Sequence, residues 1–347
     1  MVSLLDKLLF TKHLSVMIKS GITIAESIEV LSHQTKSDRL KHILDEVSKD
    51  IKNGQSLARS LSKHPKAFSD FYISLIDVGE ESGTIDKNLD YLAKQLAKDY
   101  QLRKKIQGAL LYPTIVVSAI TIIGIGMSLF VLPKLVELFT SLDVKLPITT
   151  KILLYFANLM KNHGVFIIAG FVAAIFLLRI LISLSFVRPK WDRITLSFPI
   201  FGTLFQNQQL SILCRNLGIM LKSGLPITKA LEVEHKASEN YVFKDYIEGI
   251  QKAVDKGKAI EDELTLGHYS KFSPIAVKMI GVGERTGKLD ETFLYLGDFF
   301  EEEVDDTTKN LPVVLEPLLL LIIGLMVGFV ALAIISPIYE LTGAIKR

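Results

Sequence analysis

The sequence repeats itself at a distance of 203 to 204 residues. The segment KSGITIAESIEV begins at Lys19, and KSGLPITKALEV begins at Lys222. Further along, VGEESG begins at Val78 and VGERTG begins at Val282. Solenoid repeats are about 20–50 residues long, so a period of this size indicates a duplicated domain. The chain is therefore predicted to contain two copies of one folding unit.

Both repeats have the residue spacing of helices. Ile43, Val47 and Ile51 recur every four residues, and the alternation typical of strands is absent. We predict that each repeat forms an antiparallel bundle of about six helices. Glycines at matching positions are expected to end helices in the left-handed conformation: Gly21, Gly54 and Gly83 in the first repeat, and Gly224, Gly257 and Gly287 in the second.

Three long apolar segments accompany the repeats. Residues 106–133 and 317–339 carry no charge, and residues 164–187 are interrupted only by Arg179. A helix of about 20 apolar residues crosses a bilayer core. We therefore predict an all-α membrane protein with two homologous cytosolic helical bundles and three transmembrane helices. The mean hydropathy is high, at +0.35, although 22% of the residues are charged. Both values are explained if the charged residues lie in the bundles and the apolar residues in the transmembrane helices.

Basic residues beside the apolar segments predict the orientation. Arg103, Lys104 and Lys105 precede the first segment, and Arg188 follows the second; such flanks mark the cytoplasmic side. The expected protein is a multi-pass protein of the plasma (inner) membrane with a cytoplasmic N-terminus. Local charge around the third segment points the other way, because the acidic residues 301–306 precede it and basic residues end the chain.

The predicted boundaries follow from these segments. They are 1–107 for the first cytosolic repeat, 108–133, 164–187 and 312–339 for the transmembrane helices, 134–163 for an extracytoplasmic loop, 188–311 for the second cytosolic repeat and 340–347 for an extracytoplasmic tail.

Small residues are spaced four positions apart in each predicted transmembrane helix. Such pairs let helix backbones approach closely in lipid, within one chain or between chains. The glycines of these pairs are Gly124, Gly170, Gly324 and Gly328.

The segment GERTGK at residues 283–288 is similar to a phosphate-binding loop but does not fit one. Its glycines are one residue too close together, and Leu289 stands where the metal-binding hydroxyl is needed. We interpret it as a corner between two helices that recurs in both repeats. The predicted structural corners comprise Gly21, Gly79, Glu80 and Gly83 in the first repeat, and Gly224, Gly283, Glu284 and Gly287 in the second.

The sequence contains no recognisable catalytic, cofactor or metal-binding motif. Seven histidines are scattered, no G-x-S-x-G is present, and Cys214 lies in an apolar helical pattern typical of a buried thiol. No catalytic residue, cofactor or metal site is predicted. A net charge of +3 is too small to indicate direct binding of nucleic acid.

An acidic run precedes the third apolar segment. A solvated helix face, a site for a hard cation and a docking surface for a basic partner are all compatible with it. The candidate docking residues are Glu301, Glu302, Glu303 and Asp305.

These features together resemble a known family, the GspF-like or PilC-like inner-membrane platform proteins of type II secretion and type IV pilus machines. The resemblance rests on the two VGE corners, on Tyr112-Pro113 and Glu316-Pro317 at the start of the first and last spans, and on FFEEEVD at residues 299–305. It implies two cytosolic helical bundles, three spans, oligomeric assembly and no catalysis.

The resemblance also implies partners and a function. The partners are a cytosolic hexameric secretion or assembly ATPase, pilin-like subunits, other inner-membrane assembly proteins, further copies of the chain as a homo-oligomer, and membrane lipid. The expected function is a platform that couples the ATPase to insertion or extraction of pilin-like subunits. The alternative is a small membrane transporter or channel component, which needs ionisable groups that converge at mid-membrane.

Overall fold

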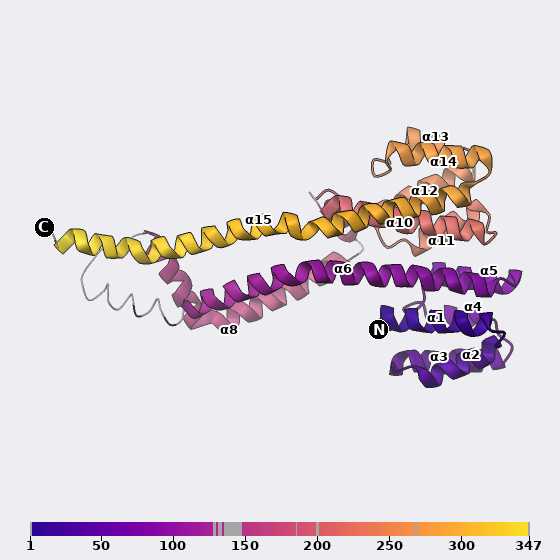
Figure 1. Ribbon diagram of the computed structural model, residues 1–347, viewed down its shortest axis with the longest axis horizontal. Coiled ribbons are helices and arrows are strands. Elements are labelled where there is room, and N and C mark those ends of the chain that lie inside the picture. The colour runs from indigo at the N-terminus through magenta and orange to yellow at the C-terminus, as the bar shows by residue number, and fades with distance from the viewer. Residues whose placement is uncertain are drawn as a thin grey trace. The chain divides into compact units, whose positions relative to one another are not determined.

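The computed structural model describes residues 2–127, 130, 134, 148–184, 186–198, 201–267 and 269–345. These residues form helices and connecting turns, and no strand occurs among them (Figure 1). The all-α prediction is therefore confirmed for this part of the chain.

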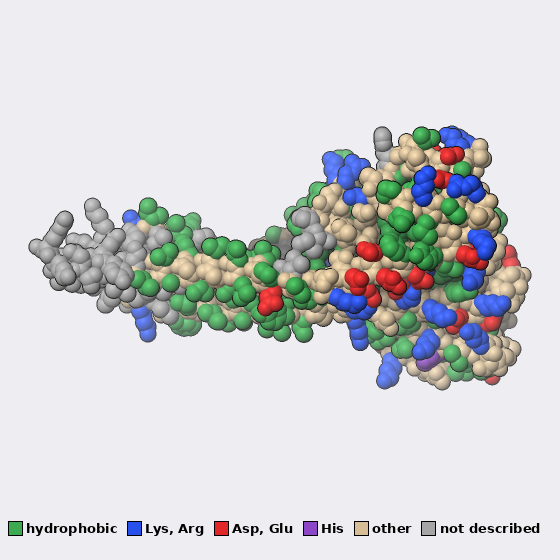
Figure 2. All heavy atoms as spheres, turned by 45° about the horizontal axis from the view of Figure 1, so that its top comes forward, with side chains coloured by type: hydrophobic (Ala, Val, Ile, Leu, Met, Phe, Trp, Pro, Cys, Tyr) green, Lys and Arg blue, Asp and Glu red, His purple; other side chains and the backbone are tan. Residues whose placement is uncertain are grey.

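Contacts divide the chain into two units. The helical unit comprises Met1–Lys104 and Arg188–Thr307, and the apolar unit comprises Lys105–Val187 and Thr308–Arg347. Charged side chains gather on the helical unit, whereas hydrophobic side chains predominate on the coloured part of the apolar unit (Figure 2). The helical unit thus contains both sequence repeats.

Each repeat supplies a series of helices to the helical unit, and α10 to α15 of the second repeat correspond to α1 to α6 of the first. The first repeat forms α1 (Leu4–Lys19), α2 (Ile24–Gln34), α3 (Asp38–Lys52), α4 (Leu57–Ser62), α5 (Asp70–Ser82) and the start of α6 (Ile85–Gly126). The second begins with α9 (Arg188–Thr195) and continues as α10 (Phe201–Lys222), α11 (Ile227–Ala237), α12 (Tyr241–Val254), α13 (Ile260–Leu266), α14 (Pro274–Thr286) and the start of α15 (Leu289–Ile345).

Local sequence signals explain where these helices begin and end. Ser3 accepts a hydrogen bond from the Asp6 amide at 3.0 Å, and the Asp6 carboxylate accepts one from the Ser3 amide at 3.2 Å, which together form a capping box. At the opposite ends, the six glycines predicted to terminate helices have positive φ, for example 70° at Gly83 and 71° at Gly287. Glycine adopts this conformation without a steric penalty.

The two repeats share one hydrophobic core. In the first repeat the ring centroids of Phe68 and Tyr72 lie 5.0 Å apart, and the Tyr72 hydroxyl lies 3.0 Å from the Thr11 hydroxyl. Cys214 of α10 is fully buried in the same core, and burial raises the pKa of its thiol. The prediction of a buried thiol is confirmed.

The apolar unit contains α8 (Ile148–Ser183) and the remainder of α6 and α15. By length and composition, α6 and the Leu289–Phe329 part of α15 are able to cross a membrane, and almost none of their most apolar residues is buried. A core helix of a soluble protein would be mostly buried, so this exposure favours a membrane environment. The two helices contain the predicted first and third spans.

The predicted second span lies in α8, which is 36 residues long. Among the described residues, α8 is not one of the helices whose length and apolar composition suit a membrane crossing. The number of three spans therefore stays a prediction. Helix α8 already begins at Ile148, inside the predicted loop 134–163, and α15 continues to Ile345, inside the predicted tail. Lys346 and Arg347 lie outside the described residues.

Candidate functional site

The corner glutamate of the first repeat caps a neighbouring helix. Glu80 lies near the end of α5, and its carboxylate accepts hydrogen bonds from the amides of Leu57 at 2.7 Å and Ala58 at 2.8 Å. These are the first two residues of α4, whose amides have no partner within that helix. A carboxylate at this end is also favoured by the helix dipole.

Glu284 occupies the same place in the second repeat. Both of its carboxylate oxygens lie 2.9 Å from the Ile260 amide, and one lies 3.3 Å from the Glu261 amide, at the start of α13. The residue that precedes α13 is Ala259, which has no side-chain acceptor. In the first repeat Ser56 supplements Glu80 by accepting from the Arg59 amide at 3.2 Å. The start of α13 therefore depends on Glu284 more strongly than the start of α4 depends on Glu80.

The glycine beside each glutamate permits close packing of the next helix. A Cβ atom at Gly79 would lie 2.8 Å from the Cα atom of Ile85 in α6. At Gly283 it would lie 2.9 Å from the Cβ atom of Thr292 in α15. Real Cβ atoms do not approach other atoms this closely, so any larger residue displaces α6 or α15.

The corners also contribute to the contact between repeats. Asn88 of α6 packs near Gly79, donates to the Leu75 carbonyl at 2.9 Å and accepts from the Ser223 hydroxyl at 3.0 Å. Ser223 directly precedes Gly224, which has a φ of 95°; Gly21, its counterpart, has a φ of 84°. A corner of the second repeat is thus hydrogen-bonded to the first.

One end of the acidic run is engaged within the helical unit. Glu301 of α15 pairs with Lys98 of α6 at 2.6 Å and with Arg215 of α10. Asp298, one turn earlier, lies 3.3 Å from Lys98 and 2.7 Å from Arg215. Only 8% of the Arg215 side chain is exposed, so its charge needs these carboxylates. We call Lys98, Arg215, Asp298 and Glu301 the ionic bridge.

The other predicted docking residues are placed differently. Glu302 and Glu303 are exposed, and Asp305 is half-buried. The structure therefore separates Glu301, whose carboxylate serves the ionic bridge, from Glu302 and Glu303, whose side chains face outward. Sequence reasoning grouped them because they are adjacent, although consecutive helical residues point in different directions.

The glycines proposed to pack transmembrane helices lie in α6, α8 and α15. A Cβ atom added at Gly124, Gly170, Gly324 or Gly328 would have no neighbour within 4 Å. Among the described residues, therefore, none of these glycines packs closely against another helix.

A buried carboxyl group between the repeats was not found from the sequence. Glu234 of α11 lies beside a cavity of about 340 Å³ that both repeats line, and its carboxyl group accepts a hydrogen bond from the Asn216 amide group at 3.0 Å. Burial raises the pKa of Glu234 to about 8, although the bond from Asn216 opposes this. Burial also raises the pKa of Asp99, in the same cavity, to about 6, against the attraction of Arg103.

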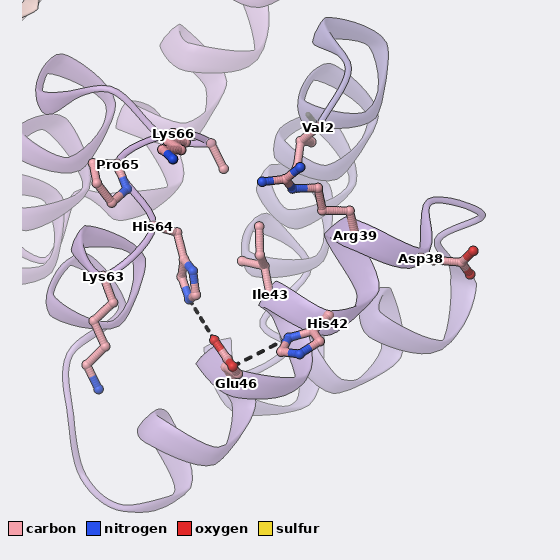
Figure 3. A pocket seen from close by; sticks show the side chains of 11 residues that line it. Val2, Asp38, Arg39, His42, Ile43, Glu46, Lys63, His64, Pro65 and Lys66 are labelled. Carbon is pink, nitrogen blue, oxygen red and sulfur yellow. Dashed lines mark ion pairs between the residues drawn. The ribbon is translucent and has the colours of Figure 1, made fainter.

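A second pocket, of about 610 Å³, lies in the first repeat (Figure 3). Glu46 points between two imidazoles, with one oxygen 3.4 Å from Nδ1 of His42 and the other 3.3 Å from Nε2 of His64. Arg39 and Lys66 also line the pocket. No group of three or more His, Cys, Asp or Glu residues in the described part of the chain has the geometry to hold a metal ion.

Replacement of the corner glutamates is expected to destabilise the helical unit. In Glu284→Ala, α13 loses its cap, and the free energy of unfolding falls by about 1.5–3 kcal/mol, the usual contribution of hydrogen bonds to a charged group. Glu80→Ala is expected to cost less, because Ser56 remains. Thermal unfolding of the detergent-solubilised chain measures both. Glu81→Ala, at an exposed neighbour, is the control, and equal stability of Glu284→Ala and this control would contradict the assignment.

Glu234 is expected to make stability depend on pH. Its folded pKa lies above the ordinary value of 4.5, so the folded chain binds an extra proton and its stability falls as pH rises from about 4.5 to about 8. In Glu234→Gln the side chain stays uncharged, so stability is expected to fall less as pH approaches 8. The melting temperature at pH 8 is expected to be higher than that of the unchanged chain. Glu232→Gln, in the same helix, is the control, because Lys236 and Lys229 hold the pKa of Glu232 down to about 2. An unchanged profile in Glu234→Gln would contradict the burial argument.

In a comparison with known proteins, one family matches both repeats. The family described as type II secretion system (T2SS), protein F, matches residues 10–133 and again residues 213–337. Type IV pilus assembly protein PilC of Thermus thermophilus is 31% identical over 346 residues, which cover 98% of this chain and 84% of that protein. Type II secretion system protein F of Vibrio cholerae is 26% identical, over 99% of this chain and 84% of that protein.

Both matched segments contain a corner glutamate that accepts hydrogen bonds from the amides at the start of a short helix. Both also contain the start of a helix that is long and apolar enough to cross a membrane. The chain therefore belongs to the family of type II secretion system protein F, which includes the type IV pilus assembly protein PilC.

Proposed function

We propose that this chain is a non-enzymatic assembly platform that couples a cytosolic hexameric ATPase to insertion or extraction of pilin-like subunits. In this proposal it is a multi-pass inner-membrane protein with three transmembrane helices, and its N-terminus and both repeats lie in the cytoplasm. The named roles of its relatives in type IV pilus assembly and type II secretion support the proposal.

One observation carries the mechanical part of the proposal. Helices α6 and α15 each begin in the helical unit and continue without a break into an apolar segment. In this proposal, a force applied to the helical unit is transmitted along the backbone of these helices, although Pro113 lacks the amide hydrogen that would complete the hydrogen bonding of α6. The apolar ends of these two helices would then act on pilin-like subunits in the bilayer.

The corners and the ionic bridge hold the two helices at their starting ends. Gly79 and Gly283 set the close approach of α6 and α15 to the preceding helices, and Lys98 of α6 is paired with carboxylates of α15. The two helices would therefore move together when the ATPase acts. Further copies of the chain, other inner-membrane assembly proteins and membrane lipid complete the proposed partners, with no direct contact to nucleic acid.

The exposed part of the acidic run is the proposed ATPase docking surface. Glu302 and Glu303 face outward on α15, whereas Glu301 is held by Arg215 and Lys98. A basic surface on the partner would complement Glu302 and Glu303, with Asp305 at the edge. Charges at the rim of an interface mainly steer the partner and select it.

A break in α6 is expected to uncouple the two ends of the platform. Gln101 is exposed within α6, and proline there removes one helical hydrogen bond and clashes with the preceding turn, at a local cost of about 3 kcal/mol. We expect Gln101→Pro to abolish filament assembly or secretion while ATPase co-purification and membrane levels persist. Gln101→Ala is the matched control. Full assembly by Gln101→Pro would contradict force transmission through α6.

Reversal of the exposed acidic charges is expected to weaken ATPase binding. Like charges across an interface cost several kcal/mol, so the double variant Glu302→Lys, Glu303→Lys should lower ATPase co-purification by roughly tenfold or more. The control reverses two exposed carboxylates elsewhere on the helical unit, Glu81→Lys with Asp262→Lys. Equal ATPase recovery from both double variants would show that docking occurs elsewhere.

A further inference from the structure

Helix α9 leaves a stripe of apolar side chains uncovered. Trp191 is 38% exposed, Ile194 is 56% exposed and Phe198, just beyond the helix, is 58% exposed. Residues three positions apart lie on one side of a helix, so Trp191 and Ile194 share a side of α9. We call these two side chains, together with the exposed Phe198 that follows the helix, the apolar stripe. No residue of α9 itself is fully buried.

The opposite side of α9 is held against the helical unit. The Asp192 carboxylate accepts a hydrogen bond from the Tyr241 amide of α12 at 2.9 Å. Leu196 is buried, and its carbonyl accepts from the Lys271 ammonium group at 3.0 Å. These contacts determine which side of the segment faces the protein. The apolar stripe is therefore held outward and cannot turn into the core.

Basic residues of α9 are exposed as well. The side chains of Lys190 and Arg193 are exposed, and the guanidinium group of Arg188 lies 6.0 Å from the centre of the Tyr241 ring. Asp192 is the one acidic residue of α9, and it is bonded to Tyr241. Tryptophan and aliphatic side chains flanked by cations are typical of helices that lie in the interface of an anionic membrane.

The position of α9 in the chain agrees with a membrane surface. Only four residues separate Ser183, the end of α8, from Arg188, the start of α9. An extended chain covers at most about 3.6 Å per residue, so α9 begins no more than about 18 Å from the end of α8. If α8 crosses the bilayer, as the proposed function assumes, α9 begins close to the headgroup layer.

We propose that α9 is an interfacial helix that binds anionic phospholipid. Trp191, Ile194 and Phe198 lie at the boundary between headgroups and acyl chains, and Lys190 and Arg193 contact the phosphates. The second repeat then has its own contact with lipid, separate from the long apolar helices. The inference depends on the proposed function only in taking α8 as a membrane span.

Trp191 is the only tryptophan of the chain, so its fluorescence reports on α9 alone. The full chain is reconstituted in nanodiscs of phosphatidylcholine, with or without phosphatidylglycerol, and with lipids brominated at different depths. We expect blue-shifted emission, weak quenching by aqueous acrylamide, and the strongest quenching by bromines about 5–10 Å below the headgroup boundary. The blue shift should be larger when phosphatidylglycerol is present.

Two variants separate the apolar and the charged contributions. Ile194→Asp with Phe198→Asp should abolish the quenching by brominated lipid and restore quenching by acrylamide. Lys190→Gln with Arg193→Gln should remove the dependence on phosphatidylglycerol, since each basic side chain near an anionic surface contributes about fivefold to binding. Leu266→Asp, at an exposed apolar residue on α13, is the matched control and should change neither signal.

Two results would overturn the inference. In the first, acrylamide quenches Trp191 as strongly in nanodiscs as in the unfolded chain, and brominated lipid has no effect. In the second, the emission is blue-shifted but brominated lipid does not quench it, which assigns the stripe to a protein contact such as a second copy. Filament assembly by the same chain tests the proposed function separately, so normal assembly with either result would contradict the lipid contact alone.

Discussion

The helical unit depends on one interaction that occurs twice. In each repeat a half-buried glutamate supplies the missing hydrogen-bond acceptor for the amides at the start of a short helix. Glu80 holds α4, and Glu284 holds α13, each across more than twenty residues of chain. Helices this short have little stability of their own, because nucleation is costly. The adjacent Gly79 and Gly283 bring in α6 and α15 at the same corners. One dipeptide thus positions both a short helix and a helix that continues into an apolar segment.

Duplication has produced two repeats that are similar in backbone but different in what they contribute to their shared contact. The first repeat supplies Lys98 and Asn88, whereas the second supplies Arg215, Glu301, Ser223 and the buried Glu234. Buried charged groups are costly unless they are paired or neutral, which explains both the ionic bridge around Arg215 and the raised pKa of Glu234. The contact between repeats is therefore sensitive to charge and to pH.

Much of the fold could be predicted from single residues and their spacing. The positive φ values at Gly21, Gly83, Gly224 and Gly287 follow from local chemistry, because a helix that must turn back needs a residue that tolerates the left-handed conformation. The role of Glu80 could not be predicted in the same way, since its partners Leu57 and Ala58 are distant in the sequence. The partners of Glu301 were missed for the same reason, and its exposed neighbours Glu302 and Glu303 were assigned to the same surface.

The amino-acid sequence by itself determined the duplication, the helical class, the places where helices turn and the apolar segments, because each of these depends on residue type and spacing along the chain. Only the tertiary structure decided which carboxylates cap helices, which bridge the repeats, and which remain outside. It also decided that α9 turns Trp191 outward while Asp192 faces Tyr241. These outcomes depend on distances between segments far apart in the chain, and packing of the whole unit sets those distances.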